Sequence, residues 1–438
     1  MSYNERDYQK MYDERRGTLA DALALIQSGD VIWSANNYNE AATLLSHIHE
    51  IADRVENVTV FKSRIGDYPF MTTPGMGEHI LCLNYFYGPR YREAHRLRNA
   101  SFIPVDLPSY YLSASKRRPL TVFAAQVSPM DEHGYFCIGM NQTLESRAIM
   151  DAVEGHKKII LEVNPNLTWM RGCATVHVSN VTCLYEVDTP EYVIGTPPAS
   201  KEDNVIGEAV ASLIEDGDCI QMGIGGIPDM VGAHLMNKHD LGLHTEQFTS
   251  SMAELISAGV ITGARKPYDT GLHIGVFADG THDLYHYLHG HPRCVLRSGA
   301  EVLSLPNIAR QDHMVSINTI IEMDLTGQAC AESIGPTQYS GSGGSFCFTL
   351  GTYYAAHGKG ILCFPSRTKK GIPKIRAQLT PGAVVTHQRN YIQYVVTEHG
   401  IVDLRGTSVR ERAQLLISLA HPDDRPELKR AAKELCYF

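Results

Sequence analysis

The sequence predicts an α/β fold built as two open domains, each with a mainly parallel sheet covered by helices. Three observations carry this prediction: the length of 438 residues, apolar strand-like runs that alternate with amphipathic helical patterns, and one internal repeat. A chain of this length is too long for one ordinary hydrophobic core, so two domains are expected. Alternating strands and helices are typical of parallel sheets with both faces covered.

The internal repeat nearly halves the chain. Residues 24–32 read ALIQSGDVI and residues 212–220 read SLIEDGDCI, so Leu, Ile, Gly, Asp and Ile recur at matching places. Each copy predicts a helix end, a Gly-Asp turn and a short apolar strand. A chance match is the alternative, because such turns are common in α/β proteins. The segment GTPPASKED (195–203) is a good linker, which predicts domains at 1–195 and 204–438.

Other segments fit the same α/β pattern. Short apolar runs predict strands, and runs with helical periodicity predict the helices between them. The predicted strands are VTVF (58–61), PLTVFAAQVS (119–128), KKIILEV (157–163) and GILCF (360–364), and the predicted helices include 147–156 and 408–420.

Composition excludes several classes of protein. The net charge is −9, and without a basic stripe the chain is a poor nucleic-acid binder. No stretch approaches the roughly 20 apolar residues of a membrane helix, and the charged N-terminus lacks a signal core. Ten isolated cysteines without a C-x-x-C pair argue against a zinc ribbon or a thioredoxin motif. We therefore expect a cytoplasmic protein without a membrane partner, whose cysteines are buried thiols.

A glycine-rich segment, QMGIGGIPDMV (221–231), directly follows the second copy of the repeat. Gly223, Gly225 and Gly226 allow the backbone to approach a ligand closely. Pro228 and Asp229 suit the first turn of a helix, whose N-terminus favours an anion. The segment lacks the G-x-G-x-x-G pattern and the Walker lysine, so a tight structural turn remains the alternative.

An acidic residue, Glu246, ends the strand-like segment LGLHTEQ (241–247). Open α/β sheets bind ligands at the carboxyl ends of their strands, so a carboxylate at this position is a candidate catalytic group. It follows the glycine-rich segment by about twenty residues, a spacing that suits adjacent strands of one sheet. A solvated surface glutamate is the alternative.

Two later segments also suit an anionic ligand. YSGSGGSFCF (339–348) exposes backbone N–H groups, or is merely a flexible loop. FPSRTKKGIPKI (364–375) offers Arg367, Lys369 and Lys370 to a nucleotide phosphate, or is a solvated run of charges.

Two other clusters are assigned to structure. The histidines of HDLYHYLHGH (282–291) have no H-E-x-x-H pattern and no completing ligands, so no metal site is predicted. Asp131, Glu132 and His133 in VSPMDEHGYFCIG (127–139) are expected to order a connection between two strands.

Together these segments resemble the acetyl-CoA hydrolase/transferase family, especially its 4-hydroxybutyrate and butyrate CoA-transferase branch. The resemblance runs nearly from end to end, and the order and spacing of the motifs carry it. Besides the segments above, the matching motifs are EVNPN (162–166), HVS (177–179), SAGVIT (257–262), DLTGQACAESIG (324–335), YVVTEHGIVDLRG (394–406) and SVRERAQLLISLAHP (408–422).

The resemblance implies two CoA-transferase-type (NagB/RpiA-like) domains with the active site at their interface. It implies that Glu246 is a nucleophile that forms a glutamyl-CoA thioester in a ping-pong reaction. The oxyanion and CoA contacts implied by the family are Gly223, Ile224, Gly225, Gly226, Ile227, Gly343, Gly344 and Lys369. Coenzyme A is then a substrate, with no permanently bound cofactor, and a homodimer or higher homo-oligomer is expected.

One departure from the family pattern adjoins the predicted nucleophile. The family commonly continues with a Met-x-Ser-Asp-Gly-like run, whereas this chain has QFTSS (247–251). Gln247, Ser250 and Arg64 are the predicted substrate-pocket residues, and they suit a dicarboxylate such as succinate or itaconate about as well as a monocarboxylate. An acyl-CoA hydrolase of the same family and a non-catalytic small-ligand sensor are the alternative functions.

Overall fold

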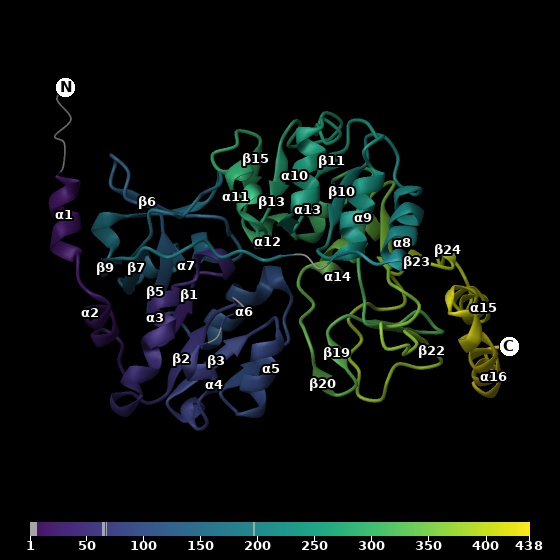
Figure 1. The fold of residues 1–438 in the computed structure, drawn as a ribbon, viewed down its shortest axis with the longest axis horizontal. Helices are drawn as coiled ribbons and strands as arrows, with labels where there is room; N and C mark the ends of the chain where they lie inside the picture. The colour runs from purple at the N-terminus through teal and green to yellow at the C-terminus, as the bar shows by residue number, and fades with distance from the viewer. Residues whose placement is uncertain (1–6, 64–65, 67, 196–197) are drawn as a thin grey trace. The chain divides into compact units, whose positions relative to one another are not determined.

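The computed structural model describes residues 7–63, 66, 68–195 and 198–438 (Figure 1). The chain divides into two compact units. The first contains residues 1–194 and 276–299, and the second contains residues 195–275 and 300–438. Within the described residues, no helix combines the length and apolar character that crossing a membrane requires.

The first unit is built on a seven-stranded sheet whose paired strands are all parallel. Its order is β4-β3-β2-β1-β5-β7-β9, so the chain moves outward from β1 on one side and then continues on the other. The strands are β1 (Val31–Ser34), β2 (Val58–Phe61), β3 (Ile80–Asn84), β4 (Ala100–Phe102), β5 (Val122–Val127), β7 (Lys158–Val163) and β9 (Cys183–Glu186).

Helices between these strands bury apolar side chains against the sheet. Ile32, Val58 and Val60 of the strands share one core with Leu44 and Leu45 of a helix. The helices of this unit are α1 (Tyr8–Arg15), α2 (Leu19–Ala24), α3 (Ala42–His47), α4 (Pro69–Thr72), α5 (Pro89–Arg96), α6 (Tyr110–Arg117), α7 (Glu145–Glu154) and α11 (His282–Leu288).

A hairpin of β6 (Tyr135–Ile138) and β8 (Ala174–His177) also belongs to the first unit. The Asp131 carboxylate accepts hydrogen bonds from the backbone N–H groups of His133 and Tyr135, at 2.9 and 2.8 Å. Asp131 therefore orders the turn that enters β6, as the sequence predicts.

The second unit contains a six-stranded sheet of order β11-β10-β16-β21-β23-β24. All its pairs are parallel except β23 with β24. The strands are β11 (Gly242–Leu243), β10 (Cys219–Met222), β16 (Met314–Asn318), β21 (Lys359–Cys363), β23 (Tyr394–Thr397) and β24 (Gly400–Asp403). The predicted fold class, α/β with mainly parallel sheets, is confirmed.

Helices again accompany the second sheet (Figure 1). They include α8 (Lys201–Ala211), α9 (Gly226–His234), α10 (Ser250–Ser257), α13 (Leu305–Ala309), α14 (Ser345–Tyr354), α15 (Val409–Leu419) and α16 (Arg425–Glu434). Leu362 and Val395 of the sheet share a core with Leu416 and Ile417 of α15.

The internal repeat is also a structural repeat. In the first unit, Asp30 Oδ2 lies 3.0 Å from Lys158 Nζ, and in the second, Asp218 Oδ2 lies 3.1 Å from Lys359 Nζ. Lys158 and Lys359 are the first residues of β7 and β21, which lie two strands from β1 and β10 respectively. The two sheets therefore share the order of five strands, β2-β1-β5-β7-β9 and β11-β10-β16-β21-β23, as well as a turn motif.

Candidate active site

The carboxyl edge of the second sheet collects most of the predicted site segments. Its strands are parallel from β11 to β23, so their carboxyl ends meet at one edge. The chain runs from β10 to β11 on one side and to β16 on the other, and ligands bind at such reversals. At this edge lie Glu246 after β11, Gly223 after β10, Asn318 at the end of β16, Ser366 after β21 and Glu398 after β23.

The backbone before Glu246 is fixed by the sheet. His244 N donates to Ile220 O at 3.2 Å, and Thr245 N donates to Ile274 O at 2.9 Å. His244 and Thr245 are buried, and the imidazole of His244 lies 2.8 Å from Val302 O. Glu246 is thus held at the strand end with a half-buried side chain.

The structure brings Glu246 together with the second glycine-rich segment, 98 residues further along the chain. Gly344 N donates to Glu246 Oε2 at 2.8 Å. Gly344 is the N-cap residue of α14, so its N–H has no partner within the helix, and the positive end of the helix dipole faces the carboxylate.

Only glycine fits at position 344. A Cβ atom there would lie 1.8 Å from Leu303 Cδ2 and 2.3 Å from Glu246 Oε2. The preceding Gly343 has a φ of +55°, in the left-handed region that favours glycine. Gly343 and Gly344 therefore allow the helix N-terminus to approach the carboxylate.

Burial changes the chemistry of this carboxylate. It raises the pKa of Glu246 to about 7, although the Gly344 N–H acts in the opposite direction. An unperturbed glutamate has a pKa of about 4.3 and would be almost fully ionised at neutral pH. At neutral pH a larger share of Glu246 is therefore protonated than of an unperturbed glutamate.

The first glycine-rich segment turns from β10 into α9. Gly223 N donates to Ile317 O at 3.1 Å, Gly225 has a φ of +118°, and α9 begins at Gly226. The side chain of Ile224 is 58% exposed, whereas Ile227 is buried in the helix. The backbone from 223 to 226 follows β10, and Glu246 follows the neighbouring strand β11. Neighbouring strands of a sheet lie about 4.8 Å apart.

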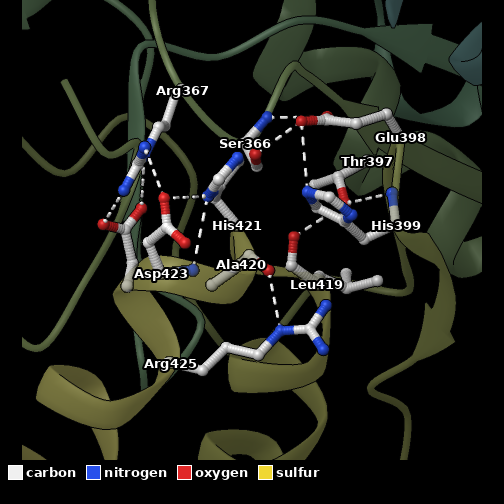
Figure 2. A network of polar contacts seen from close by, with 11 residues as sticks. Ser366, Arg367, Thr397, Glu398, His399, Leu419, Ala420, His421, Asp423 and Arg425 are labelled. Carbon is white, nitrogen blue, oxygen red and sulfur yellow. Dashed lines mark hydrogen bonds and ion pairs between the residues drawn. The ribbon is translucent and has the colours of Figure 1, made fainter. Parts of the chain in front are cut away.

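The first residues of the basic loop after β21, Ser366 and Arg367, are held by hydrogen bonds and ion pairs (Figure 2). Arg367 binds Asp424 in a bidentate pair, with Nε–Oδ2 and Nη2–Oδ1 distances of 2.8 and 2.6 Å. Asp424 therefore occupies two of its donors, and a contact of Arg367 with a phosphate stays a prediction. Glu398 accepts hydrogen bonds from the backbone N and hydroxyl of Ser366 at the start of the loop. Lys369 is exposed and follows this anchored start.

The predicted substrate-pocket residues have different outcomes. Arg64 lies outside the described residues. Gln247 belongs to the short strand β12 (Gln247–Phe248), and Ser250 is the first residue of α10. Both side chains are half-buried, and what places them beside Glu246 is their closeness in sequence.

Two candidate residues were missed from the sequence. Asn318 exchanges side-chain hydrogen bonds with Gln221, and the shorter one, from Nδ2 to Oε1, is 3.1 Å long. Asn318 and Glu398 both lie at strand ends of the edge that carries Glu246. A polar residue that closes an apolar strand, as in MVSIN and YVVTE, is the signal that identifies such positions.

No metal cluster is found in the part of the chain that the structure describes: no three His, Cys, Asp or Glu side chains there could hold an ion. His282, from the histidine-rich segment, instead pairs with Glu191, with Nδ1 2.9 Å from Oε2.

Comparisons with known proteins find relatives along almost the whole chain. A family model described as acetyl-CoA hydrolase/transferase C-terminal domain matches residues 280–432. The succinyl-CoA:cyclohexane-1-carboxylate CoA transferase of Geobacter metallireducens is 35% identical over 98% of both chains. The 4-hydroxybutyrate coenzyme A transferase of Clostridium kluyveri is 34% identical over 98% of this chain and 99% of its own. The crystal structure of RipA from Yersinia pestis superposes with a TM-score of 0.92 at 31% identity, covering 99% of this chain and 100% of that chain.

Proposed function

Because the chain belongs to the acetyl-CoA hydrolase/transferase family and is a CoA-transferase, we propose that Glu246 is its covalent nucleophile. The observation that carries this proposal is the 2.8 Å hydrogen bond from Gly344 N to the half-buried Glu246 carboxylate. A carboxylate at a strand end, facing a helix N-terminus, has both a reactive oxygen and a donor for developing negative charge.

The reaction proceeds through two covalent states of Glu246. A carboxylate oxygen attacks the thioester carbonyl, forming an acyl-glutamyl anhydride and expelling CoA thiolate. The thiolate attacks the glutamyl carbonyl, forming a glutamyl-CoA thioester and releasing the first acid as its carboxylate. The acceptor carboxylate then runs these steps in reverse, so no water or proton is consumed overall. Covalent catalysis of this kind divides one difficult exchange into easier steps.

Gly344 contributes as an oxyanion donor. Its N–H already reaches a glutamate oxygen, and that oxygen becomes the oxyanion when thiolate attacks the glutamyl carbonyl. One such preorganised donor is typically worth about 3–4 kcal/mol of transition-state stabilisation. We assign Gly223, Ile224, Gly225, Gly226 and Ile227 to further oxyanion and CoA contacts, and exposed Lys369 to a CoA phosphate.

We propose a short carboxylic acid as acceptor and acetyl-CoA or succinyl-CoA as donor. Relatives at 34–35% identity are named for 4-hydroxybutyrate and for cyclohexane-1-carboxylate with succinyl-CoA, so both monocarboxylates and dicarboxylates are candidates. The candidate acceptors are 4-hydroxybutyrate, butyrate and a dicarboxylate such as itaconate. Initial rates with a panel of C2–C6 acids, each at equal concentration against both donors, identify the acceptor.

Acyl-CoA hydrolysis is the second candidate reaction, because the family includes hydrolases and water can attack the same intermediates. The two reactions differ in their acceptor. CoA released from acyl-CoA without an added acid, at a rate that acids do not increase, identifies a hydrolase. Formation of a new acyl-CoA only when an acid is present identifies a transferase. The third alternative, a non-catalytic sensor, conflicts with membership of an enzyme family.

Substitution of Glu246 tests the nucleophile. Glu246→Ala and Glu246→Asp are expected to lower transfer by at least about 10³-fold, because the attacking oxygen is removed or withdrawn by one methylene. Borohydride or hydroxylamine is expected to trap wild-type enzyme only after acyl-CoA is added, with the label on the peptide that contains residue 246. Near-normal turnover in either variant excludes Glu246 as the nucleophile, and intersecting rather than parallel initial-rate plots exclude the ping-pong scheme.

Assembly, location and cofactor content are proposed from the family likeness and the composition. We propose a cytoplasmic homodimer or higher homo-oligomer that holds no permanent cofactor and uses CoA as a substrate. Light scattering of the purified protein measures the assembly, and its absorbance spectrum and metal content measure any bound group.

A further inference from the structure

A buried imidazole lies behind the helix N-terminus that holds Glu246. The side chain of His387 is fully buried, and burial lowers its pKa to about 4, so the ring is neutral at neutral pH. Its backbone is fixed by two hydrogen bonds with Ala329, from His387 N to Ala329 O at 2.9 Å and from Ala329 N to His387 O at 3.1 Å. The ring is thus held on a rigid support.

Both ring nitrogens of His387 reach hydroxyl groups of α14. Nε2 lies 3.3 Å from Ser345 Oγ, and Nδ1 lies 3.1 Å from Thr349 Oγ1. Ser345 is the residue directly after Gly344, and Thr349 lies one turn further along the helix. His387 therefore contacts the first and second turns of the helix whose N-cap residue binds the candidate nucleophile.

Counting hydrogens shows how the contacts are shared. Thr349 Oγ1 donates to Ser345 O at 3.0 Å and Ser345 Oγ donates to Ser342 O at 2.8 Å, so each hydroxyl oxygen can accept from the ring. A neutral ring carries one N–H, so His387 donates to Ser345 Oγ or to Thr349 Oγ1 according to its tautomer. His387, Ser345 and Ser342 thereby tie the SGSGG loop to the helix.

We propose that His387 is a positioning residue for the nucleophile: its Nε2 contact with Ser345 fixes the turn from which Gly344 N–H holds Glu246. This inference rests on the proposed role of Glu246. It goes further than that role, because it requires His387, which does not react itself, to hold Gly344 N–H in place to bond the Glu246 carboxylate.

Three substitutions test the proposal. His387→Ala removes both contacts, His387→Gln retains a polar group near the position of Nε2, and His387→Asn retains one near the position of Nδ1. The Ala and Asn variants are expected to lose about 10- to 100-fold in kcat/KM for acyl-CoA, because a small displacement of a catalytic group has effects of this size. The Gln variant is expected to recover most of the loss.

The pH profile separates positioning from general damage to the fold. If the Gly344 N–H moves away from Glu246, a contact that lowers the pKa of Glu246 is lost. The midpoint of the kcat/KM profile is therefore expected to rise by about half a pH unit or more in the Ala and Asn variants, and to stay at the wild-type value in the Gln variant. The matched control is Thr352→Val, which removes a buried hydroxyl bonded to Phe348 O further along the same helix.

The outcomes are distinguishable from failure of the proposed function. An unchanged midpoint in His387→Ala, equal behaviour of the Gln and Asn variants, or the same midpoint shift in Thr352→Val overturns the positioning role. If His387→Ala does not fold, the Gln and Asn variants decide the matter. Loss of activity in Glu246→Ala under the same conditions keeps the nucleophile in place, whatever the His387 variants do.

Discussion

At the scale of a single residue, Glu246 combines two demands that oppose each other. A nucleophile must be ionised, yet burial favours its neutral form. The Gly344 N–H stabilises the ionised form, and burial still dominates, since the pKa of the group rises to about 7. A carboxylate of higher pKa is a more basic nucleophile once it is ionised. A smaller fraction of Glu246 is therefore ionised at neutral pH, but each ionised carboxylate is more reactive.

The raised pKa predicts how activity depends on pH. Only the carboxylate attacks a thioester, so kcat/KM for acyl-CoA is expected to rise with pH, reach half its maximum near pH 7 and level off above about pH 8. Initial rates from pH 5 to 9 at constant ionic strength measure this profile. A plateau that already extends down to pH 5.5 contradicts the raised pKa.

Stability provides the control for the same titration. A carboxyl whose folded pKa exceeds its unfolded value of about 4.3 stabilises the fold fully below pH 4.3, and this contribution is lost as pH rises through about 7. Glu246→Gln remains neutral throughout. At pH 8 this variant is therefore expected to be more stable than wild type, by at most about 4 kcal/mol, and near pH 4.5 the two are expected to melt at the same temperature. Equal melting temperatures at pH 8 indicate that the charged form is not penalised.

At the scale of an element, the N-terminus of α14 decides whether Glu246 has a donor. The close approach depends on the absent side chain at position 344, because Leu303 and Glu246 occupy the space where a Cβ would lie. The helix cannot move back without breaking the contacts of Ser345 and Thr349 with His387.

Gly344→Ala is therefore expected to lower kcat/KM by at least about 100-fold, because the added methyl group displaces the carboxylate. The double variant Gly344→Ala/Leu303→Ala relieves the closer clash and is expected to restore stability without restoring activity. Gly195→Ala, where a Cβ meets nothing within 4 Å, is the matched control and is expected to behave as wild type in both assays. Activity assays with thermal melts of all three variants measure the effect, and full activity in the double variant contradicts it.

The elements themselves were largely predictable from the sequence, since their signals are local. Predicted strands 58–61, 157–163 and 360–364 correspond to β2, β7 and β21, and predicted helix 408–420 corresponds to α15. The contact of Glu246 with Gly344 was not predictable, because the sheet order and the placement of α14 decide it over 98 residues. The pKa of Glu246 and the role of His387 depend on burial, which a lone acidic or imidazole side chain in a polar segment does not reveal.

At the scale of the whole molecule, each unit repeats one tie between a Gly-Asp turn and a lysine two strands away. The copies differ at the second carboxylate oxygen. Asp30 Oδ1 accepts from Thr121 Oγ1 at 2.8 Å. Asp218 Oδ1 faces His313 Nδ1 at 3.7 Å and has no hydrogen-bond donor among the described residues.

Asp30→Ala is therefore expected to cost more stability than Asp218→Ala. Removing either aspartate leaves a partly buried lysine without its carboxylate, bonded still to Leu25 O or Leu213 O, at a cost of about 2–4 kcal/mol. The extra bond to Thr121 adds about 1 kcal/mol for Asp30. Hydrogen exchange by mass spectrometry measures the effect where it occurs, in β1 for one variant and in β10 for the other. Equal loss of protection in both strands by either variant contradicts a tie that acts within its own unit.

The repeated tie also separates scaffold from chemistry. Five strands in matching order, β2-β1-β5-β7-β9 and β11-β10-β16-β21-β23, carry the same lysine–aspartate bracket in the two sheets. The bracket is present in both units, whereas β11 is followed by His244-Thr245-Glu246 and β2 by Lys62-Ser63-Arg64, so Glu246 has no acidic counterpart at that place in the sequence after β2. The two units therefore share a scaffold, and the candidate nucleophile belongs to the second.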